Sequence, residues 1–431
     1  MIRVPAAQSA NEQSYVTSLK KIKVLAITGF ANLLELYDFT LFAVLLPVLV
    51  GHFFPSSDHE SSMLIGYLAF AVSFLIAPIG SIIWGYIGDR FGSGKIFKLS
   101  LLLMAFPSLA ISLLPTYEEV GYIAPILLIM LRIFQGFSAS GEVLASKIYA
   151  FDKVGAPNFL QASALISAFG GVGVLLALYG GAYVSANMNS QIWRIPFAIG
   201  GGMILVMMLV RMSLLRDDSV QVKRPLITLF SVVDIVRENK KAATYGFTAS
   251  AMLGVLSYFM HGFLVNFQVS HLGCEITFAY KATKIGLIGT IITASILGLF
   301  YKRSVDRHIL CKSMLAIAIL AMPLYLLLLL KLKLITYISL FLMGGLLGVF
   351  ASLSGVYVIA SFAKEERCRG ALLVNAFGVA IFGGITPVIM TILAGINILL
   401  PGIALSAVFV VGFGISHSER RLGILWMALR C

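Results

Sequence analysis

Long apolar blocks, separated by short polar interruptions, follow one another along the whole chain. A bilayer core about 30 Å thick needs roughly 20 apolar residues in a helix that crosses it. Each block has about that length. The pattern therefore predicts an all-α polytopic membrane protein with twelve transmembrane helices, over residues 24–50, 62–87, 97–114, 122–147, 158–185, 194–213, 242–268, 284–301, 312–330, 334–362, 370–394 and 398–416.

The longest polar interruption covers residues 214–241, near the middle of the chain. It leaves six predicted spans on each side, which indicates two halves. We therefore expect an N-terminal six-helix half over residues 1–213, a cytoplasmic linker loop over 214–241 and a C-terminal six-helix half over 242–431.

A short charged motif occurs once in each half. Asp89-Arg90, with Lys95 six residues after the acid, lies between predicted spans 2 and 3. Asp306-Arg307, again with a lysine six residues after the acid, lies between spans 8 and 9. The matching place and spacing favour an internal repeat, and chance occurrence of a common dipeptide is the alternative. For the function of the motif, the alternative to a contact between the halves is a solvated charged turn.

Composition excludes a soluble protein. Of the 431 residues, 59% are apolar and 12% are charged, whereas a soluble domain carries about 25% charged residues. The net charge of +13 is compatible with a nucleic-acid partner, but the basic residues form short clusters between apolar spans. That distribution is typical of cytoplasmic loops, so we expect a lipid bilayer and no nucleic acid as the surroundings.

Lysine and arginine also predict the orientation. With the N-terminus placed inside, most of the 32 basic residues fall in inner segments. The outer segments hold only Arg194, Lys281, Lys284, Lys331 and Lys333. This bias places both termini in the cytoplasm and the protein in the cell inner membrane. The polar stretch before Lys20 predicts a first span that is not cleaved as a signal peptide.

Four charged residues are predicted to lie well inside spans: Glu35, Asp38, Arg132 and Glu142. Each would cost about 2.5–3.5 kcal/mol at the bilayer centre if it were unpaired. From the directions of spans 1 and 4, Glu35, Asp38 and Arg132 lie at about the same depth. Glu142 is ten residues beyond Arg132, about 15 Å along the helix, and is too far away to pair with it.

Several stretches resemble a known family. Residues 85–95 (GYIGDRFGSGK) resemble the loop signature of the major facilitator superfamily. Residues 32–39 (NLLELYDF), 132–142 (RIFQGFSASGE) and 193–197 (WRIPF) resemble helices 1, 4 and 6 of its metabolite:proton symporter family, and 375–387 (NAFGVAIFGGITP) resembles helix 11. The resemblance implies the major facilitator fold. It also implies proton-coupled symport of a small solute, as in transporters of proline and betaine, 2-oxoglutarate, citrate and shikimate.

The chain also departs from that family. Leu36 stands where the family has Trp, Leu160-Gln161 replaces the Arg-Gly expected after Pro157, and Lys302 stands where Gly is expected. The loop signature ends in Gly-Ser-Gly-Lys where two basic residues are usual. These departures keep open a transporter-fold sensor or a degenerate, non-transporting homologue.

The resemblance assigns roles to the charged residues. Arg132 is expected to bind a carboxylate of the solute, and Asp38 first, Glu35 second, or Glu142 to carry the proton. Binding of the solute at Arg132 would neutralise the cation beside the acid and favour its protonation, which couples the two fluxes. A structural pair between Arg132 and an acid of span 1 is the alternative.

Further candidates carry less specific signals. Gln135, Tyr37, Tyr258 and Asn375 are expected to contribute to solute binding, and His261 to proton coupling, although a lone His in an apolar span is more often a packing residue. The gating set joins the two halves through close approach at glycine and through a helix N-terminus. Its members are Gly85, Asp89, Arg90, Lys95, Asp306 and Arg307.

An enzyme is not expected, because no cluster of metal ligands and no nucleophile motif appears. The four cysteines, at positions 274, 311, 368 and 431, have neither metal-ligand spacing nor the pattern of a disulfide framework. We expect no cofactor, no metal and a monomer. Efflux by proton antiport stays open, since a fold does not determine the direction of transport.

Overall fold

The computed structural model describes residues 6–55, 59–187, 191–214, 231–301 and 307–417. These residues form helices and no strand. The α-helices are α1 Ala6–Phe53, α2 His59–Phe91, α3 Ser93–Leu113, α4 Tyr117–Val120, α5 Ile123–Val154, α6 Phe159–Ala186, α7 Arg194–Leu214, α8 Ser231–Glu238, α9 Lys240–Tyr258, α10 Leu264–Ser270, α11 Ile276–Phe300, α12 Arg307–Leu329, α13 Lys333–Ala360, α14 Arg367–Phe377, α15 Gly384–Ile396 and α16 Leu400–His417.

Twelve helical stretches in the described ranges are long and apolar enough to cross a membrane. Each coincides with one predicted span, so the predicted number is confirmed. Ten spans are single helices. Span 7 joins α9 and α10 through a π-helical segment, Phe259–Phe263, and span 11 joins α14 and α15 through a second one, Gly378–Gly383.

Several predicted boundaries are wrong because lysines were assigned to loops; helix α1, for example, begins at Ala6 and not at residue 24. Helix α5 continues to Val154, beyond the predicted end at Lys147, and α11 begins at Ile276, before the predicted start at Lys284. The predicted linker loop contains a short helix, α8, over Ser231–Glu238. Its residues 215–230 lie outside the described part of the chain.

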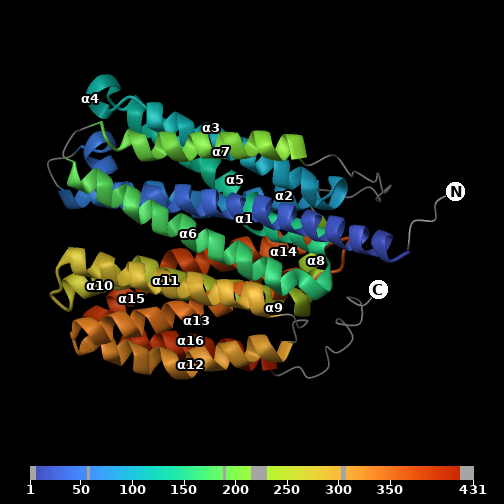
Figure 1. Cartoon of the computed structure of the whole chain (residues 1–431). Coiled ribbons are helices and arrows are strands. Elements are labelled where there is room, and N and C mark those ends of the chain that lie inside the picture. The colour runs from blue at the N-terminus through green and yellow to red at the C-terminus, as the bar shows by residue number, and fades with distance from the viewer. Residues whose placement is uncertain (1–5, 56–58, 188–190, 215–230, 302–306, 418–431) are drawn as a thin grey trace.

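The helices run roughly parallel to one another, and the first six spans lie beside one another (blue to green in Figure 1). Helix α1 packs on α6, α2 on α5 and α3 on α5 and α7. Among the last six spans, α11 packs on α13, and α12 on α13 and α16. Because the number of spans is even, α1 begins and α16 ends at the same end of the bundle, which is the predicted cytoplasmic end.

Helices of the two sets also meet one another. Helix α2 packs on α14, and α6 packs on α11 and α13. Small residues permit these approaches: a Cβ atom at Gly85 would lie 2.7 Å from the Cα atom of Arg369, and one at Gly298 would lie 2.6 Å from the side chain of Leu165. The two sets are therefore in direct contact through closely packed helices.

The outer surface of the bundle is apolar. Leu75, Leu113 and Phe300 are among the many large apolar side chains that are mostly exposed. In water such a surface would be unfavourable, whereas lipid chains cover it without cost. The polar residues are found inside the bundle, where Asp38, Arg132 and Glu142 are fully buried.

Candidate functional site

Arg132, Gln135 and Asp38 form a connected group at the middle of spans 1 and 4. Nη1 of Arg132 donates a 2.9 Å hydrogen bond to Oε1 of Gln135. Nε2 of Gln135 in turn donates to Oδ2 of Asp38 at 2.6 Å and to Oγ of Ser108 at 3.3 Å. The amide therefore connects the cation to the acid, whereas the alternative interpretation of the sequence was a direct pair between Arg132 and an acid of span 1.

Parts of this group have no partner. Nε and Nη2 of Arg132 and Oδ1 of Asp38 are buried and make no hydrogen bond within the described residues. The guanidinium lies 4.0 Å from the ring centroid of Phe42 and within 5.4 Å of those of Phe39 and Phe70. An unpaired buried donor or acceptor costs about 1–3 kcal/mol, more for a charged group, so these atoms are suited to an external carboxylate and an external proton.

Helix α9 presents Tyr258 to this group from the second set of spans. Tyr258 interacts electrostatically with Arg132, and its ring packs edge-on against Phe74 of α2 at 5.5 Å. His261 follows in the π-helical segment, and its Nε2 atom is buried without a hydrogen-bond partner in the described part of the chain. Of these two predicted residues, Tyr258 interacts with the Arg132 group, whereas His261 is buried three residues further along span 7.

Two other predicted residues have different surroundings. The hydroxyl of Tyr37 donates a 2.9 Å hydrogen bond to the carbonyl oxygen of Pro196, which connects α1 to α7. Oδ1 of Asn375 accepts a 3.3 Å hydrogen bond from Ser250. Ser250 lies eight residues before Tyr258, about 12 Å along the helix, so the structure does not bring Asn375 to the level of Arg132.

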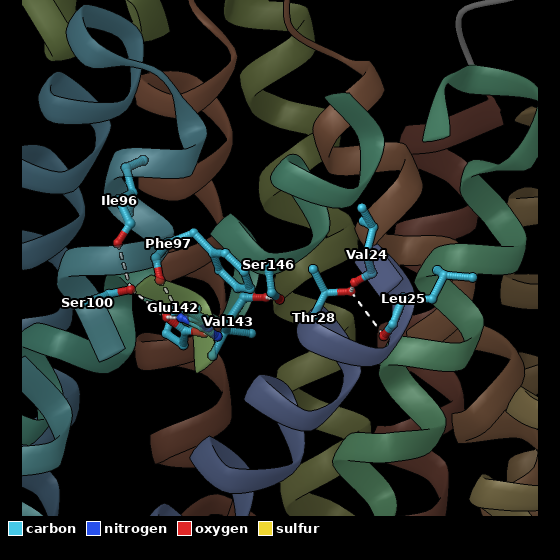
Figure 2. Close-up of polar contacts among 10 residues, drawn as sticks. Val24, Leu25, Thr28, Ile96, Phe97, Ser100, Glu142, Val143 and Ser146 are labelled. Atoms are coloured by element: carbon cyan, nitrogen blue, oxygen red, sulfur yellow. Dashed lines mark hydrogen bonds and ion pairs between the residues drawn. The ribbon is translucent and has the colours of Figure 1, made fainter. Parts of the chain in front are cut away.

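Glu142 belongs to a second buried group, nearer the predicted cytoplasmic end. Its carboxylate accepts hydrogen bonds from Ser100 of α3 and from both terminal nitrogens of Arg211, at 2.5 and 3.2 Å. Arg211 also donates to the carbonyl oxygen of Phe97 and lies over the ring of that residue. Figure 2 shows Glu142 beside Ser100 and Phe97.

This second group corrects the count of charges inside the spans. Arg211 was assigned to the cytoplasmic segments, yet it lies in α7 with 1% of its surface exposed. Lys147, also assigned to an inner loop, is buried within α5. Both lie close to the ends of predicted spans, where a basic residue usually marks the beginning of a loop. Ser100 of α3, which donates a hydrogen bond to Glu142, could not be recognised as its partner from the sequence.

Glu35 lies one turn of α1 nearer the predicted cytoplasmic end than Asp38. Its side chain is 1% exposed, and neither carboxylate oxygen has a hydrogen-bond partner among the described residues. The charged groups that interact with it electrostatically are Glu142, Arg211 and Asp38. Glu35 therefore lies between the two buried groups without being bonded to either of them.

The loop motif forms a contact that we call the cytoplasmic latch, made by Asp89 of α2 with Cys368 and Arg369 of α14. Asp89 accepts hydrogen bonds from the backbone N–H groups of Cys368 and Arg369 at 3.0 and 3.1 Å and from Nε of Arg369 at 2.7 Å. These residues lie at the first turn of α14. Asp89 is thus at a helix N-terminus of the other half, as the sequence led us to expect.

The rest of the gating set differs from expectation. Arg90 was expected to join the two halves, but it is exposed and contacts the hydroxyl of Tyr86 and the ring of Phe91, both on its own helix. Nζ of Lys95 lies 4.0 Å from the centroid of the same Phe91 ring. Arg307 begins α12, but its side chain and Asp306 lie outside the described residues, so the role of the second copy of the motif stays a prediction.

A second ion pair beside the latch was not predicted. Nη1 of Arg367 lies 3.5 Å from Oδ1 of Asp152, the residue at the end of α5, and Oδ2 of Asp152 accepts a 2.6 Å hydrogen bond from Ser93. The acid belongs to the first six spans and the base to the last six. Charged residues at helix ends are common, so neither one was distinguishable in the sequence. Among the described residues, no group of side chains has the composition of a metal site.

Twelve apolar spans around buried, partly unpaired charges define a polytopic membrane transporter. The family model described as Major Facilitator Superfamily matches residues 28–387, and the chain belongs to that family. The expected fold and family are confirmed, and the chain is a transporter, not an enzyme.

Individual relatives agree with this assignment. The chain is 25% identical over 438 residues to the proline/betaine transporter of Escherichia coli strain K12, covering 92% of this chain and 83% of the relative. It is 33% identical over 262 residues to the alpha-ketoglutarate permease of the same strain, covering 58% and 60%. The solved structure of the proton:xylose symporter XylE matches with a TM-score of 0.71 at 14% identity, covering 92% of this chain and 95% of that chain, which supports the fold.

Proposed function

We propose that this protein is a secondary active transporter that carries a small carboxylate-bearing solute together with protons by alternating access. The observation that carries the proposal is the Arg132–Gln135–Asp38 group, a buried cation and acid that are connected but not fully paired. A solute that occupies the free donors of Arg132 satisfies them and compensates its charge. Asp38 then loses the influence of the cation and takes up the proton.

The solute class follows from the shape of this group. Arg132 offers two free nitrogens in one plane, which suits the two oxygens of a carboxylate. Phe39 and Phe70 lie beside the guanidinium, and aromatic faces also attract alkylammonium groups. The chain resembles a proline/betaine transporter and an alpha-ketoglutarate permease, so a proline- or betaine-like osmolyte or an organic acid is proposed.

The residues around the Arg132–Gln135–Asp38 group have different roles in this proposal. Tyr258 and His261 complete the solute site from the second half, while Glu35 is the second candidate for the proton. Glu142 is fully paired with Arg211, a geometry that favours a structural role over proton transfer. Tyr37 acts by holding α1 against α7.

The latch is proposed to stabilise the outward-facing state, because it joins the two halves at the cytoplasmic end and must open for release. This assumes the predicted orientation, with both termini cytoplasmic, in the inner membrane of the cell, and two six-helix halves that move relative to each other as a monomer. Labelling intact cells with an impermeant maleimide tests the orientation: Cys274 should react from outside and Cys368 should not.

A transport screen tests the function. Purified protein in liposomes is given labelled proline, glycine betaine, 2-oxoglutarate, citrate and shikimate, with and without an inward proton gradient. The proposal expects accumulation of at least one of them that collapses when a protonophore is added. Accumulation that instead requires an outward proton gradient would indicate proton antiport, and binding without flux of any solute would indicate a sensor.

A further inference from the structure

Lys147 of α5 lies between the two halves with 7% of its surface exposed. Its ammonium donates a 3.1 Å hydrogen bond to Oγ of Ser167 on α6 and a 3.2 Å hydrogen bond to the carbonyl oxygen of Ala351 on α13. Both acceptors are neutral. Within the described ranges, no acidic side chain pairs with Lys147 or interacts with it electrostatically.

The surroundings of Lys147 are polar and closely packed. Oγ of Ser163 donates to the carbonyl oxygen of Ser352 at 2.8 Å, which joins α6 to α13 beside the lysine. A Cβ atom at Gly355 would lie 2.8 Å from Nζ and Cδ of Lys147. Glycine on α13 therefore leaves the space that the ammonium fills in the closed arrangement.

The position of Lys147 relates it to Arg132. The two residues are 15 apart on one helix, which is about 22 Å along the axis and about 60° around it. Both thus lie on nearly the same side of α5, Arg132 at midspan and Lys147 near the cytoplasmic end. A solute that leaves Arg132 toward the cytoplasm passes this second cation.

Opening of the cytoplasmic end changes the partners of Lys147. Alternating access separates the halves largely as rigid bodies, so Ala351 moves away with α13 while Ser167 stays with α6. An ammonium has three donors, and at least two of them then face the opened passage. Closing buries the charge again among neutral oxygens, which is unfavourable for an unpaired ion.

We propose that Lys147, with Ser167, is an exit-side binding site for a carboxylate, available when the cytoplasmic end is open and occluded by Gly355 and α13 when it is closed. The site holds the carboxylate of the solute after Arg132 has released it, and the solute must leave before the halves can close. The inference rests on the proposed function for alternating access and for the carboxylate of the solute. A merely structural lysine would instead tie α13 to α5 without any response to anions.

Alkylation of Cys368 tests the proposal without requiring transport. Cys368 is buried in the latch, so its rate of reaction with N-ethylmaleimide, followed by peptide mass spectrometry on the full chain, reports opening. A ligand that binds only the open form, at about twice its dissociation constant, raises the open population about threefold. Sodium acetate should therefore accelerate alkylation about threefold over sodium chloride at the same ionic strength.

Matched variants decide the outcome. Lys147→Met should remove the acetate effect, whereas Lys147→Arg should retain part of it. Lys153→Met, which removes an exposed charge six residues further along α5, should behave as the wild type. An acetate effect that persists in Lys147→Met, or an equal effect of chloride in the wild type, would overturn the carboxylate site. Failure of proton coupling at Asp38 would leave this measurement unchanged, so the two proposals fail separately.

Discussion

Helix α5 contributes to two buried charged groups, ten residues apart, that are satisfied to different degrees. Toward the predicted cytoplasmic end, Glu142 accepts hydrogen bonds from Ser100 and from two nitrogens of Arg211. In that group only Nε of Arg211 is buried without a partner among the described residues. At midspan, Arg132 reaches Asp38 only through Gln135, and both charged groups keep atoms without partners among the described residues.

This difference in hydrogen bonding is what we expect between a charged group that only holds helices together and one that takes part in transport. A buried charge that only holds helices together is most stable when every donor and acceptor is occupied. A group that must exchange partners during a cycle keeps free positions for them. We therefore propose that the Glu142–Arg211 pair supports the framework of the first six spans and that the Arg132–Asp38 group binds the transported species.

Breaking the paired group should have the largest effect. Glu142→Gln should destabilise the protein by about 3–5 kcal/mol, because it leaves the buried guanidinium of Arg211 without its counter-ion. The folded yield and the denaturation midpoint in mixed detergent micelles measure the loss.

The control for this prediction is the double variant Glu142→Gln with Arg211→Met, which removes both charges. It should recover most of the lost stability and retain transport. Loss of proton-driven accumulation in a well-folded double variant would indicate that Glu142 carries the proton.

Asp38→Asn should abolish accumulation against a gradient while the folded yield stays normal. The amide cannot carry the proton, but solute binding at Arg132 persists, so counterflow exchange should remain. Uptake of labelled solute into liposomes measures accumulation against a gradient, and exchange of labelled for unlabelled solute measures counterflow. Glu35→Gln, one turn away on the same helix, is the matched variant: if it loses accumulation and Asp38→Asn keeps it, Glu35 is the proton carrier.

Arg132→Lys should weaken solute binding at midspan and change stability little. An ammonium cannot present two parallel donors to a carboxylate, and a hydrogen bond to a charged group contributes about 1.5–3 kcal/mol, roughly 10- to 150-fold in affinity. Isothermal titration with the solute found in the transport screen measures this. Arg237→Lys, at an exposed position of α8, is the control, and equal affinities of the two variants would contradict a carboxylate site at Arg132.

The smallest change in free energy is expected at the latch. Its acid, Asp89, is a third buried charge, and it is fully hydrogen-bonded but lies where the two sets of spans are proposed to separate. Asp89→Asn removes the charge opposite Arg369 and should favour the inward-open state by about 1–2 kcal/mol, or roughly 5- to 30-fold in population. The rate of Cys368 alkylation reports the shift. An unchanged rate would mean that the contact with α14 does not control opening.

The sequence was sufficient for the spans, since each apolar block has the length that a bilayer requires. It also placed Asp38 and Arg132 at one depth and Asp89 at an interface between halves. These predictions depend on helix rise and on hydropathy, which are local properties of the chain.

The pairings could not be predicted in the same way. Arg211 and Lys147 were assigned to cytoplasmic segments because a basic residue near the end of an apolar block normally faces water. Their burial depends on helices α3, α6 and α13, whose rotation around their axes is determined by packing and not by span length. The role of Gln135 as a connector likewise requires the distance between α1 and α5.

The π-helical segment Phe259–Phe263 offsets the two parts of span 7 in register. A π turn holds one residue more than an α turn, and each residue of an α-helix advances about 100°. Side chains of α10 therefore point about 100° away from the direction that an unbroken helix would give them. Deleting one residue there would realign α10 and turn Gln268 out of its buried place. The segment Gly378–Gly383 has the same effect on α15, so single-residue insertions and deletions in spans 7 and 11 change which side chains face the interior.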